Sequence, residues 1–151
     1  MYRLLLGLFC LLPLSAFAGG LLGVAYVDNI AGLNLEWATT HSSYYVVPGV
    51  RVTQSTGGAE KTDVRFVAGM RHRLDRGTMD TSGFFIGLIG GDLGGSADHR
   101  RNGYGGELGY QLMKKYTRWT VSGALVVLDS DEERNLNNEP AAVLGVSLSI
   151  H

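Results

Sequence analysis

The chain has 151 residues, of which 45% are hydrophobic and only 18% are charged, and its formal net charge is −1. This length suits one domain, and the absence of a basic excess excludes a nucleic-acid-binding surface. The charged share lies below the roughly 25% of ordinary soluble domains, which favours a protein with an apolar environment.

Residues 1–18 have the pattern of a cleaved signal peptide. Arg3 precedes a short apolar run, and Ala16-Phe17-Ala18 is a small-x-small cleavage site. A membrane anchor is the alternative, but the run is short and interrupted by a proline. The one cysteine, Cys10, lies inside this segment. The expected mature chain, 19–151, therefore has no disulfide, thiolate metal site or cysteine nucleophile.

Eight later segments alternate between large apolar residues and small or polar ones, which is the signature of β-strands. In chain order they are 20–28, 33–41, 43–53, 62–74, 83–92, 103–113, 117–128 and 141–151. In the sixth segment Leu108 and Tyr110 share one face while Glu107 lies on the other. In the third segment Pro48 predicts a β-bulge, because proline donates no ladder hydrogen bond.

The connections between these segments alternate in length. Three of the four on one side are long and polar, namely "QSTGGAEK", "LGGSADHRRN" and "DSDEERNLNNEP", and the fourth is "NIAG". The other side carries both termini, a tight link near Ser42, the segment 75–82 and "KKYT". Short turns on the side of the termini and longer loops opposite are typical of bacterial outer-membrane barrels. The sequence therefore predicts an all-β fold, an eight-stranded antiparallel up-and-down transmembrane β-barrel over residues 19–151.

The chain resembles a known class of proteins in its signal peptide, its eight alternating segments and its terminal "GVSLSI". These features are similar to the small eight-stranded outer-membrane proteins of the OmpX and OmpA membrane-domain type. Gly145, Leu148 and Ile150 resemble the C-terminal assembly signal of that class, which commonly ends in an aromatic residue, whereas this chain ends in Ile150-His151. The stretches "GLNLEW" and "GGELGYQL" resemble the YfaZ family of outer-membrane proteins.

The face opposite the apolar one carries polar side chains that would point into the barrel. They are Glu36, Arg51, Asp63, Arg65, Arg71, Arg73, Glu107, Gln111 and Arg118. Unpaired buried charge is costly, so we expect these groups to pair and fill the lumen as a charge network. Arg65 or Arg118 is the expected partner of Glu107. A gated polar pathway is the alternative, although a barrel of eight strands leaves little room for water.

Aromatic residues gather near the ends of the segments. Tyr44, Tyr116 and Trp119 lie on the side of the termini, and Tyr26 and Tyr104 lie near the other side. This distribution predicts two interfacial aromatic girdles. The aromatic core of a soluble barrel is the alternative.

Residues that could bind a ligand or perform chemistry are few. Arg100 and Arg101 could contact lipopolysaccharide phosphates or simply be solvated loop residues. His41 and Ser43 could share a face, but no carboxylate is spaced to orient the histidine as a catalytic base. We therefore predict no catalytic residues, no metal site and no cofactor.

These patterns together predict a non-enzymatic, monomeric barrel in the outer membrane of a Gram-negative bacterium, with a structural or surface-interaction role. Its partners would be outer-membrane lipid, including lipopolysaccharide, and the barrel-assembly machinery during biogenesis. Two alternatives stay open. A lipid-modifying enzyme, of the lipid A acyl hydrolase or acyltransferase type, requires a His, a Ser and an acid on the outer surface. A soluble periplasmic lipocalin-like barrel requires a polar exterior and an apolar cavity.

Overall fold

The computed structural model describes residues 20–54, 60–94, 100–130 and 137–150. The expected signal peptide, residues 1–18, lies outside the described residues, as do the central parts of the three long connections. Within the described part of the chain, no helix is long and apolar enough to cross a membrane.

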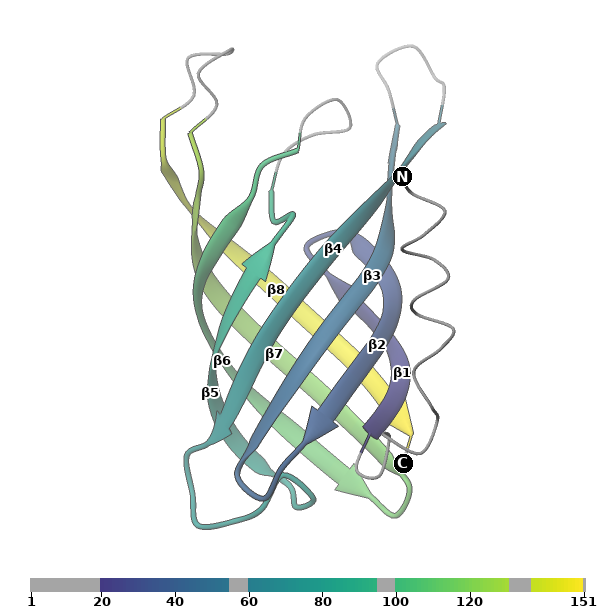
Figure 1. Cartoon of the computed structure of the whole chain (residues 1–151), viewed down its shortest axis with the longest axis vertical. Helices are drawn as coiled ribbons and strands as arrows, with labels where there is room; N and C mark the ends of the chain where they lie inside the picture. Colours follow the sequence, from purple (N-terminus) through teal and green to yellow (C-terminus); the bar gives the residue numbers. More distant parts are fainter. Residues whose placement is uncertain (1–19, 55–59, 95–99, 131–136, 151) are drawn as a thin grey trace, which may run out of the picture.

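Eight strands close into one antiparallel barrel in chain order, with β8 paired to β1 (Figure 1). This confirms the predicted all-β, eight-stranded up-and-down barrel. The strands are β1 (Gly20–Val27), β2 (Ile30–Ala38), β3 (Ser42–Gln54), β4 (Glu60–Arg73), β5 (Gly83–Gly91), β6 (Gly103–Lys114), β7 (Thr117–Leu128) and β8 (Glu139–Ile150). Their bounds agree with the predicted segments to within three residues.

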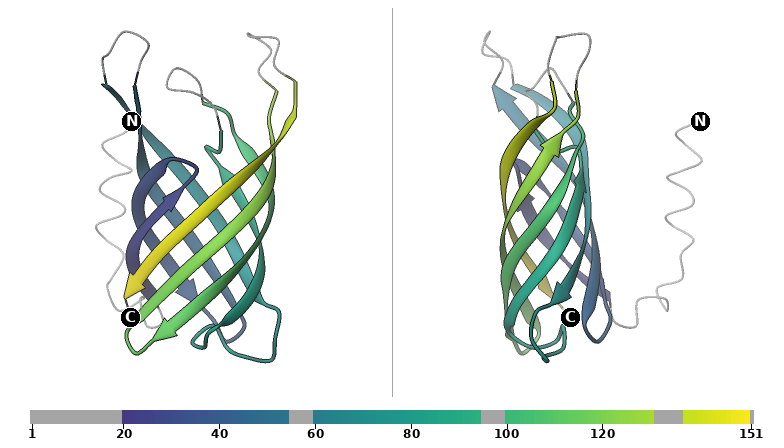
Figure 2. Two further views of the ribbon diagram at one scale, coloured as in Figure 1. Left: turned by 180° about the vertical axis from the view of Figure 1, so that it is seen from behind. Right: turned by 90° about the vertical axis from the view of Figure 1, so that its left-hand side faces the viewer.

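The two ends of the barrel differ (Figures 1 and 2). β1 starts and β8 finishes at the end drawn lowest in Figure 1, which we call the lower end. The connections β2–β3, β4–β5 and β6–β7 also lie there. The upper end carries the β1–β2 turn and the three connections that contain the undescribed residues.

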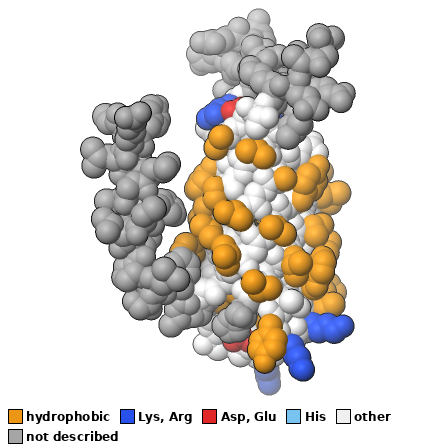
Figure 3. All heavy atoms as spheres, turned by 90° about the vertical axis from the view of Figure 1, so that its right-hand side faces the viewer, with side chains coloured by type: hydrophobic (Ala, Val, Ile, Leu, Met, Phe, Trp, Pro, Cys, Tyr) orange, Lys and Arg blue, Asp and Glu red, His pale blue; other side chains and the backbone are white. Residues whose placement is uncertain are grey.

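Strand alternation decides which side chains enter the barrel. In β6, Glu107 is buried, whereas Leu108 and Tyr110 are 57% and 39% exposed on the outer face. β7 follows the same rule without interruption, since its residues alternate between buried and exposed from Arg118 to Leu128. The outer face is consequently rich in large apolar side chains. Figure 3 shows them over the middle of one face, with Lys and Arg side chains towards its two ends.

The β1–β2 connection is shorter than the sequence indicated. Asp28 and Asn29 have φ values of 47° and 63° and form a two-residue turn, so β2 begins at Ile30 and not at residue 33. Two positive φ values are required for the tight hairpin turn whose twist matches that of its strands, and Asp and Asn tolerate them better than most residues.

The expected bulge at Pro48 is absent. β3 keeps one register with β4 through the pair Pro48–Phe66. β2 and β3 pair with the same register on both sides of Pro48, from Ile30–Arg51 to Gly32–Gly49 and again from Leu35–Val46 onwards. The proline therefore interrupts the β2–β3 ladder locally but shifts no residue, which keeps every later side chain on its expected face.

Candidate functional site

The upper half of the lumen is filled by aliphatic side chains, a feature the sequence analysis did not anticipate. Ile30 and Val67 are fully buried there, and Leu93, just after β5, is fully buried as well. Tyr45 also belongs to this cluster, and we call its aliphatic members the apolar plug: Ala25, Val27, Ile30, Val47, Val67, Ile89, Leu93, Ala124, Val126, Leu128 and Val143. Closely packed aliphatic groups of this kind disfavour water in this half of the barrel.

Above the apolar plug, Arg51 of β3 joins two connections of the upper end. Its guanidinium donates to the carboxylate and the backbone carbonyl of Asp28, at 2.5 and 2.6 Å, and to the carbonyl of Gly94 at 2.8 Å. The amide of Gly94 returns a 2.6 Å hydrogen bond to the Asp28 carboxylate. Arg51 therefore tethers the segment after β5 to the β1–β2 turn and holds Leu93 in the apolar plug.

Two further ion-paired sites lie at the upper rim. Asp63 lies between Arg65 and Arg100, at 2.8 and 2.7 Å. Arg101 is buried and donates to the carbonyls of Asp129 and Asn137, and it lies 3.1 Å from the carboxylate of Glu139. Arg101 therefore joins the start of β6 to the β7–β8 connection, and its burial differs from both roles considered for it, a surface contact for anions and a solvated loop residue.

The lower half of the lumen contains the other buried charged side chains. At its upper boundary, next to the apolar plug, Glu107 accepts hydrogen bonds from Arg71 at 3.0 and 3.3 Å and from the Tyr45 hydroxyl at 3.1 Å. The Arg71 guanidinium also lies over the Tyr45 ring, 4.0 Å from its centroid, and 5.0 Å from that of Phe85. Arg71 is therefore the partner of Glu107, in place of the expected Arg65 or Arg118.

Below this central cluster, Arg118 and Glu36 form a fully buried ion pair at 2.6 Å. Asn34 lies beside Glu36 and donates to the Ser149 hydroxyl at 2.9 Å. These contacts cross the lumen, since Glu36 and Asn34 come from β2 while their partners come from β7 and β8. Both charges are isolated from bulk water, so each depends on the other for compensation.

The β4–β5 connection closes the lower end of the barrel. Met79 is fully buried, its amide donates to the Thr40 carbonyl, and the Gln111 side chain donates to the Met79 and Thr81 carbonyls at 2.8 and 2.7 Å. Gln111 thus fixes a connection, a role that strand alternation alone does not reveal. The sequence contains no periodic signal that would have identified Met79.

Arg73 and Asp75 order the first part of that connection. The Asp75 carboxylate accepts the amide of Gly77 at 2.8 Å and pairs with the guanidinium of Arg73. The hydrogen bond from Gly77, followed by the contact with Arg73, holds the pKa of Asp75 below its ordinary value.

Several buried polar atoms of the lower lumen have no hydrogen-bond partner within the described protein. They are the hydroxyls of Ser43, Thr120 and Ser147, Nη1 of Arg71, and Nε and Nη2 of Arg118. These atoms give the lower half of the lumen spare capacity to hydrogen-bond internal water.

The aromatic residues expected in two girdles all point outwards. Tyr44, Tyr116 and Trp119 lie towards the lower end, and Tyr26 and Tyr104 lie towards the upper end. Each of the five is between 47% and 70% exposed. Amphipathic rings at two levels of an apolar outer surface are the arrangement found at membrane–water interfaces.

One polar pair on the outer face was missed at the sequence level. Ser42 and His72 are cross-strand partners, and Ser42 Oγ lies 2.9 Å from His72 Nδ1. Neither His41 nor Ser43 takes part, because Ser43 is buried inside the barrel and His41 is exposed in the turn. No acid hydrogen-bonds to His72 in the part of the chain that the structure describes, nor do its residues form a group of metal-ligating side chains.

Comparison of the chain with protein-family models, with curated proteins and with solved structures found no match.

Proposed function

We propose that the chain is a small integral outer-membrane β-barrel protein with a structural or surface-interaction role and a lumen that is not an open pore. The observation that carries the proposal is the outer face of the closed barrel. Large apolar side chains such as Leu125 and Leu144, 75% and 76% exposed, cover it, while the charged groups lie inside or at the two ends.

This distribution favours lipid over water as the surroundings of the barrel. Apolar surface left in water costs roughly 25 cal/mol per Å², and soluble proteins rarely expose extended apolar patches. A soluble lipocalin-like barrel would carry polar side chains outside and an apolar cavity inside. Here the outer face is apolar and the upper lumen is packed with side chains.

The side chains inside the barrel support the second part of the proposal, that the lumen is closed. The apolar plug fills the upper half, and Met79 with its connection covers the lower end. We assign the ion pairs to stability and not to transport, and we assign no catalytic reaction to the chain. Its partners in this proposal are outer-membrane lipid and, during insertion, the barrel-assembly machinery.

Cell fractionation combined with heat-modifiable gel migration tests the proposal. The protein is expected in detergent-extracted outer membranes, with a folded band that migrates differently from the boiled one. Purified barrel in a planar bilayer is expected to give no discrete ion conductance. Recovery from the soluble periplasmic fraction would contradict the membrane location, and a steady conductance would contradict the closed lumen.

A pair of arginine substitutions adds a depth control. Leu108→Arg places a charge near the middle of β6 on the outer face and is expected to destabilise the barrel in vesicles by about 2–4 kcal/mol, whereas Val64→Arg, towards the upper end of β4, should cost about 0–1 kcal/mol. Equal effects at the two positions would argue against a bilayer around the barrel.

A further inference from the structure

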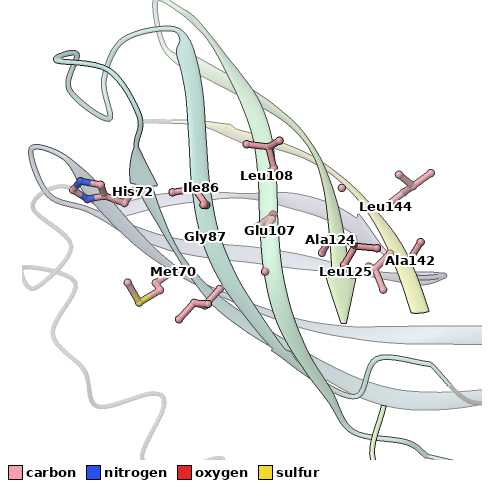
Figure 4. Close-up of a pocket in the computed structure, with 14 residues that line it drawn as sticks. Met70, His72, Ile86, Gly87, Glu107, Leu108, Ala124, Leu125, Ala142 and Leu144 are labelled. Carbon is pink, nitrogen blue, oxygen red and sulfur yellow. The ribbon is translucent and has the colours of Figure 1, made fainter. Parts of the chain in front are cut away.

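The outer wall of the barrel carries one large apolar groove. It has a volume of about 820 Å³ and extends from β4 to β8 (Figure 4). Its depth comes from small outward residues among large ones. Gly106, Gly123 and Ala142 form low points between Leu88, Leu108, Leu125 and Leu144.

The groove follows a row of register partners across five strands. His72 pairs with Ile86, Ile86 with Leu108, Leu108 with Gly123 and Gly123 with Leu144. Figure 4 shows His72 and Leu144 at opposite ends of this row, with Ile86 and Leu108 between them. Strands lie about 4.8 Å apart, so the row is about 19 Å long.

The row also climbs along the barrel. His72 is the last residue but one of β4 and lies at the lower rim, whereas Gly123 and Leu144 are each six residues from the lower ends of their strands. At the tilt of about 40° common in such barrels, a 19 Å row rises by about 12 Å. One half of a hydrocarbon core is about 15 Å thick, so the row from His72 to Leu144 remains within one leaflet.

A polar pair stands at the low end of this apolar groove. The Ser42 hydroxyl and the His72 ring are in contact at 2.9 Å, and both residues face outwards. If the hydroxyl donates to Nδ1, the Nε2 proton of the ring points outwards; if Nδ1 donates, the hydroxyl proton is free instead. Either arrangement offers one hydrogen-bond donor to a ligand at the rim.

We propose that this groove binds one phospholipid of the leaflet at the lower end, which on the proposed function is the periplasmic leaflet. One acyl chain lies along the row from Ile86 to Leu144, and the phosphate or glycerol ester accepts the hydrogen bond of the Ser42–His72 pair. A polar hook at the rim and an apolar channel that climbs to mid-height match the two parts of such a lipid. The inference rests on the proposed membrane location.

Retention of lipid by the purified barrel tests the inference. The protein is folded in nanodiscs of phosphatidylethanolamine and phosphatidylglycerol, transferred to mild detergent and weighed by native mass spectrometry. We expect one phospholipid to remain bound. A diazirine in the acyl chain of the same lipid should crosslink to β5, β6 and β7.

Filling the groove should release the lipid without harming the fold. A Cβ at Gly106 meets no atom within 4 Å, and one at Gly123 meets only Leu144 Cδ2 at 3.9 Å. The double variant Gly106→Leu with Gly123→Leu is therefore expected to fold and to lower lipid retention about tenfold, as when about two methylene groups lose their burial. His72→Leu should lower it about two- to tenfold, the range of one hydrogen bond.

Ala31→Leu is the matched control, because Ala31 is a small outward residue on β2, away from the groove. It should retain the lipid like the wild type. Absence of bound lipid in the wild type, retention in the filled variant, or equal loss in Ala31→Leu would each overturn the inference. Heat-modifiable migration, recorded for every sample, separates these outcomes from a failure of the membrane proposal itself, in which no folded membrane band would be found.

Discussion

The two halves of the lumen fill a similar space in opposite ways. The upper half uses aliphatic side chains such as Ile30 and Val67, each of which can pack against any apolar neighbour of suitable shape. The lower half uses charged groups, and there each must meet one particular partner, as Arg118 meets Glu36. A substitution that shortens a side chain in the upper half leaves a cavity. A substitution that removes one charge in the lower half leaves its partner buried without compensation.

Closure of the lumen and specificity of strand pairing are thus divided between its two halves. On the proposed function, the apolar plug blocks passage through the barrel, and we expect it to tolerate shape-conserving changes. The charged half fixes which strands face each other, because its partners are matched across the lumen. Substitutions in the two halves should therefore differ both in their cost and in how that cost can be rescued.

The largest effect is expected in the lower half. Glu36→Leu leaves the Arg118 guanidinium buried and unpaired, which should destabilise the barrel by about 3–5 kcal/mol. Urea unfolding in phospholipid vesicles, followed by the fluorescence of the two tryptophans, measures this cost. The control is the double variant Glu36→Leu with Arg118→Leu, which should recover most of the lost stability. A double variant no more stable than the single one would show that the pair is not the source of the effect.

In the upper half, Ile30→Ala should cost about 2–5 kcal/mol, and Ile30→Val only about 0.5–1.5 kcal/mol, because the loss scales with the cavity created. The same unfolding assay applies. Leu144→Ala, on the outer face, is the control and should cost less, since lipid can refill the space. The comparison fails if Arg118→Leu, which removes a charge, rescues Ile30→Ala as it is expected to rescue Glu36→Leu.

A smaller effect is expected where the two halves meet. Tyr45→Phe removes the hydroxyl that donates to Glu107 but keeps the ring under Arg71. Arg71 continues to compensate the carboxylate, so the cost should be about 1.5 kcal/mol, that of one hydrogen bond to a charged group. A loss as large as that of Glu36→Leu would mean that the tyrosine, and not the ion pair, holds this cluster together.

The smallest effect concerns the connection below the charged half. The pKa of Asp75 is lowered in the folded barrel, so its carboxylate stabilises the connection above the ordinary aspartate pKa. That contribution disappears as the pH falls through the depressed value. The amide resonance of Gly77 in a micelle-bound sample should shift with this low midpoint, and Asp75→Asn should abolish the titration. A midpoint at or above the ordinary value would contradict the assignment.

Much of the fold was predictable because inward and outward side chains alternate along each strand of a β-barrel. That pattern located Glu107 inside and Leu108 outside. It could not pair Glu107 with Arg71, because the partner across a lumen depends on how the sheet is staggered and curved. Neither could it join Ser42 to His72, which needed the register of β3 against β4 and the true end of β2.

The end of β2 shows where the alternating pattern fails to locate a strand boundary. Thr39 continues the alternating pattern, yet its side chain hydrogen-bonds to the amide and carbonyl of Ser42 and so forms the turn. A local side-chain bond to the backbone competes with the strand there. The fate of Pro48 was equally hidden, since an interrupted ladder can keep its register as readily as form a bulge.

The ion pair of Arg118 with Glu36 also bears on how the barrel is made. β7 and β2 are not neighbours in the sheet, so no hairpin of adjacent strands contains both partners. The two charges can meet only when the sheet has curled and β1 has found β8. Until that moment both must remain hydrated, and desolvating them earlier would be costly. We therefore expect this contact to form late in assembly and to be lost when the β1–β8 seam opens.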